Sequence, residues 1–112
     1  MQRFVLSFFA LLSLAVAAQA QVVTTYFVED PNGVTIGVAE HSEPDGTLTF
    51  YDANGNATWQ GKRTSPAGAN PTTFADPVSG IVVIITSDGD KIRWEVFYPN
   101  GGYAWGCLTL AG

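Results

Sequence analysis

The segment from Thr47 to Lys62, TLTFYDANGNATWQGK, constrains the fold more than any other part of the chain. Its Asn54-Gly55 pair supplies the two positive-φ residues that a two-residue type I′ hairpin turn requires. With that turn, Phe50 faces Trp59 across the two strands. One face of the hairpin then carries the apolar residues Leu48, Phe50, Ala57 and Trp59, and the other carries Thr49, Tyr51, Thr58, Gln60 and Lys62. Turn chemistry and hydrophobic pattern select the same register, so the segment predicts a β-hairpin with one core-facing side.

The start of the chain has the pattern of a secretory signal peptide. Arg3 is followed by an apolar run from Phe4 to Val16, and Ala18-Gln19-Ala20 has the small-x-small form of a cleavage site. The apolar run is too short to span a bilayer. We therefore expect a signal peptide over residues 1–20 and a single β domain over residues 21–112. The protein is expected to be secreted and extracellular, with no membrane insertion after the signal is removed.

The charge of the chain limits its partners. Ten acidic residues against five basic ones give a formal net charge of −5. An acidic protein is a poor candidate for binding nucleic acid, so we expect no nucleic-acid partner. Cys107 is the only cysteine, so a disulfide within the chain is excluded. We expect a buried, unreactive thiol in the apolar last strand; the alternative is a disulfide between two chains.

A second hairpin is predicted near the start of the domain. Residues 22–28 are β-branched and aromatic, and Asp30-Pro31-Asn32-Gly33 has the residue preferences of a type I turn. A three-residue loop with Gly33 in the left-handed conformation places Val28 opposite Ile36. A two-residue loop would place Glu29 there instead, so we prefer the three-residue loop, which keeps the acid out of the core.

The rest of the chain also has the pattern of strands and loops. Residues 81–86 form a continuous β-branched run, which is typical of a strand buried on both faces. Further strands are predicted at 91–98 and 103–110, a polar connector at 40–46, and a long proline-containing loop at 63–80. No amphipathic helix is indicated. The predicted fold is all-β, a small antiparallel sandwich or barrel of about eight strands built from hairpins.

The last hairpin has two competing registers. A two-residue loop at Asn100-Gly101 would require an amide N–H from Pro99, which proline lacks. A three-residue loop avoids this defect and moves Phe97, Tyr103 and Trp105 to the face opposite Trp94. Aromatic rings beside charged residues suit stacking on a sugar or anchoring a protein partner. We therefore predict Phe97, Tyr103 and Trp105 as binding residues, unless a second sheet or the long loop covers them.

Residues capable of catalysis or metal binding form no recognisable pattern. His41, the only histidine, lies in the polar connector, where we expect it to be exposed and unpartnered. The segment from Asp52 to Asn56 begins like a calcium loop, but Ala57 and Arg63 stand where an EF-hand needs Gly and Glu. Asp88-Gly89-Asp90 is typical of a solvated turn. We expect no metal, no cofactor and no enzymatic activity.

Residues 43–51, EPDGTLTFY, followed by the Asp-Ala-Asn-Gly turn and Trp59, resemble one repeat of the bulb-type mannose-binding lectins. The pattern of that family is Q-x-D-x-N-x-V-x-Y. Asp45 and Tyr51 match it, whereas Glu43, Thr47 and Thr49 replace its Gln, Asn and Val. The resemblance covers residues 43–61 and implies that Asp45 and Tyr51 contact a sugar. Residues 94–102 are similar to the start of a βγ-crystallin Greek-key motif, which is the alternative resemblance.

These observations define the expected function. Asn56-Ala57-Thr58 is an acceptor for N-glycosylation beside an exposed turn. We expect a small secreted, non-catalytic binding module whose partner is a carbohydrate or an extracellular protein surface. The alternative is a secreted inhibitor or effector that acts on another protein or organism.

Overall fold

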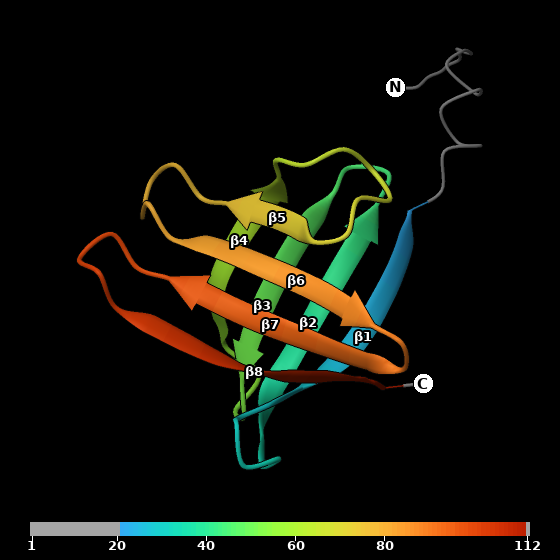
Figure 1. Ribbon diagram of the computed structural model, residues 1–112, viewed down its shortest axis with the longest axis vertical. Coiled ribbons are helices and arrows are strands. Elements are labelled where there is room, and N and C mark those ends of the chain that lie inside the picture. The colour runs from blue at the N-terminus through green and yellow to red at the C-terminus, as the bar shows by residue number, and fades with distance from the viewer. Residues whose placement is uncertain (1–20, 112) are drawn as a thin grey trace, which may run out of the picture.

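The computed structural model describes residues 21–111, so the predicted signal peptide lies outside the described residues. Eight antiparallel strands follow one another around a closed barrel, and the last strand pairs with the first (Figure 1). The strands are β1 (Val22–Glu29), β2 (Thr35–Glu43), β3 (Thr47–Asp52), β4 (Ala57–Arg63), β5 (Thr72–Ala75), β6 (Val82–Asp88), β7 (Lys91–Phe97) and β8 (Tyr103–Leu110). The all-β prediction is confirmed, and the barrel is the correct one of the two predicted architectures. Within residues 21–111, no helix has the length and apolar character needed to cross a membrane.

Two strand segments were predicted as loop. β2 continues through Glu43, so the predicted connector at 40–46 is wrong over its first half. β5 lies inside the predicted 63–80 loop, where its four residues pair with β6 and bring Phe74 into the core at 2% exposure. The physical reason is that Pro71 and Pro77 bracket this short strand, and prolines so close together are typical of a loop.

The turn of the β3–β4 hairpin differs from the predicted type I′ turn. The Asp52 amide donates to the Asn56 carbonyl and the Gly55 amide donates to the Asp52 carbonyl, so the loop has three residues. Gly55 takes the positive φ of 84° that ends such a loop. Thr58 is then an extra residue in β4, and this β-bulge restores the predicted pairing of Phe50 with Trp59. The bulge also leaves Ala57 exposed, so its predicted place on the core face is wrong.

The β1–β2 hairpin has the predicted three-residue loop, but the predicted register is wrong by one residue. The Asp30 amide donates to the Val34 carbonyl, and Gly33 has a φ of 84°. Val28 nevertheless pairs with Gly37 and not with Ile36, because Ile36 is the extra residue of a second bulge. Both bulges lie next to turns at the same end of the barrel.

The interior of the barrel is narrow, so large side chains can occupy only some of the inward-facing positions. Its buried hydrophobic residues are Val28, Ala39, Leu48, Phe74, Val83, Trp94 and Leu108. Trp94 pairs with Gly106 across β7 and β8, and its indole N–H donates to the Glu29 carbonyl on β1 at 3.1 Å. A Cβ atom at position 106 would collide with that carbonyl and lie 2.7 Å from the Trp94 ring. Gly106 therefore lets Trp94 span β8 and hold it to β1.

The β6 strand illustrates the single-layer architecture. Residues 81–86 were predicted to be buried on both faces. Val83 points inward and is 1% exposed, whereas Val82 and Ile84 are only half-buried on the outer side. The prediction is wrong for the outer side because a barrel has no second sheet to cover it.

We expect Gly106→Ala to lower the free energy of unfolding by about 3 kcal/mol, because the added methyl group cannot fit beneath Trp94. The matched control is Gly102→Ala, whose Cβ would meet only side-chain atoms at 3.1 Å or more and should cost less than about 1 kcal/mol. Chemical denaturation of the two variants measures both effects. Equal losses of unfolding free energy for the two substitutions would show that the packing of Trp94 does not require a glycine at position 106.

Candidate ligand-binding site

The predicted aromatic cluster lies on the outer surface of the barrel. The Gly101 amide donates to the Tyr98 carbonyl, and the Tyr98 amide donates to the Gly102 carbonyl, which gives the predicted three-residue loop. Phe97 consequently pairs with Tyr103, and Trp105 pairs with Glu95, all on the side opposite Trp94. The predicted register of this hairpin is confirmed.

The outer aromatic face, which we define as Phe97, Tyr103 and Trp105, is accessible. Phe97 is 38% and Tyr103 48% exposed, so neither a second sheet nor the long loop covers them. The Tyr103 hydroxyl donates to Glu95 at 2.7 Å and accepts from Arg93 at 3.1 Å. The Arg93 guanidinium lies 4.1 Å from the centre of the Trp105 ring and occupies one side of it. This face therefore combines exposed rings with a fixed pair of opposite charges.

The two residues matched by the lectin resemblance lie apart. Asp45 is exposed in the turn between β2 and β3, where it accepts a hydrogen bond from Gln21 at 2.9 Å. Tyr51 lies near the other end of β3 and donates to Glu40 at 3.1 Å, which raises the pKa of the phenol. The strand from Thr47 to Tyr51 alone spans about 13 Å between the two positions.

Two further predicted positions lie on the surface. Asn56 is exposed in the β3–β4 turn, which leaves room for a glycan. Cys107 is half-buried on the outer side of β8, between Arg93 and Glu29 on the neighbouring strands. The prediction of a buried thiol is wrong, because the register that places Trp105 on the outer side of the barrel also turns Cys107 outward.

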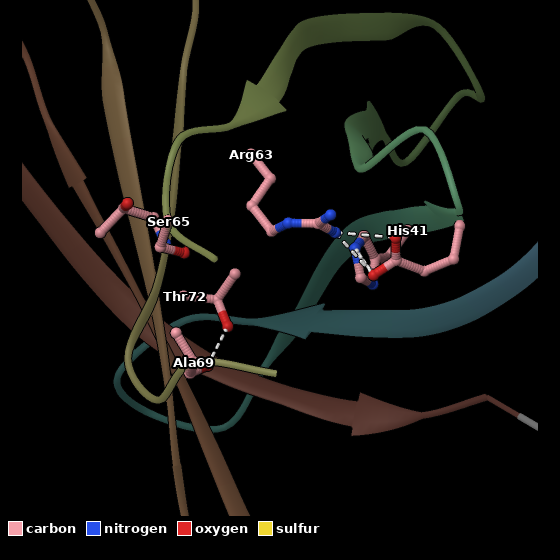
Figure 2. A network of polar contacts seen from close by, with 7 residues as sticks. His41, Arg63, Ser65, Ala69 and Thr72 are labelled. Atoms are coloured by element: carbon pink, nitrogen blue, oxygen red, sulfur yellow. Dashed lines mark hydrogen bonds and ion pairs between the residues drawn. The ribbon is translucent and has the colours of Figure 1, made fainter. Parts of the chain in front are cut away.

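His41 is half-buried, so the prediction that it is exposed is wrong, whereas its Nε2 atom has no hydrogen-bond partner among the described residues. It points into the barrel, with its ring 5.5 Å from that of Phe74 in an edge-on arrangement. Its Nε2 atom lies 3.5 Å from the Glu43 carboxylate, to which Arg63 donates at 2.7 Å (Figure 2). The Arg63 side chain is only 16% exposed. This ion pair lies at the end of the barrel where β2 and β4 end.

The opposite end of the barrel is open. We call it the mouth, a cavity of about 330 Å³ whose walls are the inward side chains Val28, Phe50, Trp59, Val83, Trp94 and Val96. Phe50 lies between the two tryptophans, with ring centres 6.1 Å from Trp59 and 6.3 Å from Trp94. Residues next to all four turns at this end complete the rim: Ile36, Asp52, Thr58, Ile81 and Tyr98. A smaller cavity of about 190 Å³ near His41 shares no lining residue with the mouth.

The two β-bulges shape the rim of the mouth. Ile36 and Thr58 are the extra residues of their strands, and both line the cavity. Bulges are common at barrel rims, where they redirect a side chain. Without the bulge, Ile36 would pair with Val28 inside the β1–β2 hairpin. The mouth was missed from the sequence because bulges and barrel closure leave no pattern in a single hairpin.

Comparison with protein-family models, with curated proteins and with solved structures finds no match for this chain. The site must therefore be interpreted from its own geometry. No group of three or more His, Cys, Asp or Glu that could hold a metal ion occurs within residues 21–111.

The carboxylate of Asp52 is fixed at the rim by its own turn. It accepts backbone N–H groups from Asn56 and Asn54, each at 2.9 Å. These hydrogen bonds, the one from Asn56 foremost, hold the pKa of Asp52 below its ordinary value of 3.8. Asp52 is therefore ionised at neutral pH.

We expect protonation of Asp52 at low pH to lower the free energy of unfolding. A folded-state pKa below the unfolded value stabilises the protein above the unfolded pKa, and this stabilisation is lost as the pH falls through the folded pKa. The loss of stability between pH 5 and pH 2 should be smaller in Asp52→Asn than in the unaltered protein. Urea denaturation across this range measures the difference. An identical pH dependence in both proteins would contradict the assignment.

Proposed function

We propose that this protein is a non-catalytic binding module that acts outside the cell and holds a small, largely apolar ligand in the mouth of its barrel. The observation that carries the proposal is a cavity with three aromatic walls, which lies among the turns at one end of the barrel. The signal-like pattern of residues 1–20 supports the extracellular location.

The size of the mouth agrees with this role. The interior of an eight-stranded barrel is just wide enough to be filled by side chains or to hold one small ligand. An apolar cavity of about 150 Å³ is enough to bind benzene in another protein. The mouth is about twice as large at 330 Å³. A ligand of one or two rings would therefore fit against Phe50, Trp59 and Trp94.

The contrast between the ends of the barrel favours the mouth as the entrance. At the far end, Arg63 and Glu43 form an ion pair, and the cavity near His41 is smaller, about 190 Å³. At the mouth, the half-buried and exposed side chains include Trp59, Val96, Ile36 and Tyr98, which offer apolar surface. Burial of apolar surface yields about 25 cal/mol per Å², so this end offers the larger gain on binding.

Filling the mouth should abolish binding. We expect Val96→Phe to weaken the binding of naphthalene at least about tenfold, because the added ring occupies the cavity. Val82→Phe is the matched control: it makes the same substitution on the adjacent strand, but on the outer side of the barrel. Chemical-shift changes of the mouth residues during a naphthalene titration give the affinities. Unchanged binding by Val96→Phe, or no binding by the unaltered protein, would contradict the proposal.

A second candidate function is carbohydrate binding on the outer aromatic face. The exposed rings of Phe97 and Tyr103 could stack on the apolar side of a sugar, and Arg93 and Glu95 could pair with its hydroxyl groups. The opposite charges of these two residues lie 3.8 Å apart and favour a neutral ligand over an anion.

We expect Phe97→Ala and Trp105→Ala each to abolish binding to glycans that the unaltered protein retains on an array. Phe27→Ala is the control, because Phe27 is 42% exposed on β1, close to the 38% of Phe97. An equal loss of glycan binding in Phe27→Ala would exclude the outer aromatic face as a sugar site. Retained binding in both Phe97→Ala and Trp105→Ala would also exclude it.

A further inference from the structure

The positively charged side chains of residues 21–111 lie away from the mouth, whereas carboxylates occur at both ends of the barrel. The turns at the mouth comprise residues 30–34, 52–57, 76–81 and 98–102, and they contain Asp30, Asp52 and Asp76 but no lysine, arginine or histidine. Lys62 and Arg63 end β4 at the far end, and Lys91 begins β7 there. The mouth is therefore surrounded by carboxylates without any compensating positive charge.

Each of these carboxylates is held in position by its turn. Asp30 accepts the amides of Asn32 and Val34, in the same arrangement that Asp52 has in its own turn. Asp76 accepts the Val78 amide at 3.0 Å. The Ser79 hydroxyl, followed by that amide, holds the pKa of Asp76 below its ordinary value of 3.8. The negative charge at the rim is thus a permanent feature at neutral pH.

The wall of the mouth also favours a cation. The faces of aromatic rings are electronegative and attract a cation within about 6 Å of the ring centre. Phe50, Trp59, Trp94 and Tyr98 contribute four such rings to one cavity. An anion would find no positive side chain there and would lose its hydration without compensation.

We propose that the mouth selects a small apolar ligand carrying a positive charge, of the aryl or alkyl ammonium class. This inference rests on the proposed function and specifies the ligand of the same site. The apolar part of such a ligand contacts the valines of the wall, while its ammonium group lies among the rings near the Asp52 carboxylate.

The test compares three probes of similar shape and different charge: phenyltrimethylammonium, tert-butylbenzene and benzenesulfonate. We expect the cation to bind about tenfold more tightly than the neutral probe, and the sulfonate not to bind. Isothermal titration calorimetry gives the affinities, with quenching of tryptophan fluorescence as a second measurement. The preference for the cation should fall as salt is added, because the rim charges are exposed.

Two substitutions locate the effect. Asp52→Asn keeps a side-chain oxygen for the turn and should weaken the binding of the cation about threefold, a larger loss than that of tert-butylbenzene. Asp90→Asn makes the same charge change in the β6–β7 turn at the far end and should leave both affinities unchanged.

The outcomes separate the two proposals. Binding of tert-butylbenzene or benzenesulfonate as tightly as the cation would overturn the charge preference but leave the proposed function intact. An equal effect of Asp52→Asn and Asp90→Asn would also overturn it. If none of the three probes binds, the proposed function fails together with this inference.

Discussion

The pairing of β1 with β8 closes the barrel, and the contact between Trp94 and Gly106 supports this closure. Trp94 starts on β7, lies over the missing side chain of Gly106 on β8, and donates a hydrogen bond to the Glu29 carbonyl on β1. One side chain thus connects three strands at the seam where the first and last strands of the sheet meet. Because an open sheet would expose two unpaired edges, the rest of the architecture depends on this closure.

Closure determines which surfaces are available for binding. The inner surface is narrow, and the wall needs small residues such as Ala39, Gly37 and Gly61 beside its large rings. The outer surface has no second layer, so the rings of Phe97 and Tyr103 remain exposed. The same backbone therefore offers one concave apolar site inside and one flatter aromatic face outside.

The ends of the barrel differ because charge and packing differ between the alternate turns. At one end His41, Glu43 and Arg63 form a compact polar group beneath Phe74. At the other end the turns carry only negative charge and the interior is lined by rings. A ligand therefore meets an ion pair at one end and an apolar cavity with a negative rim at the other.

The sequence by itself determined the strands with strong patterns, because turn chemistry and alternation act between neighbouring residues. It predicted the Phe50–Trp59 pair and the register that places Trp105 on the outer side, the latter from the missing N–H of Pro99. Only the tertiary structure decided the bulges at Ile36 and Thr58, the inward position of His41, and β5. The bulges depend on the curvature of the sheet, and the position of His41 depends on Phe74 as its partner. The strand β5 depends on pairing across the closed sheet. Such contacts join residues far apart in the chain, so local sequence patterns do not predict them.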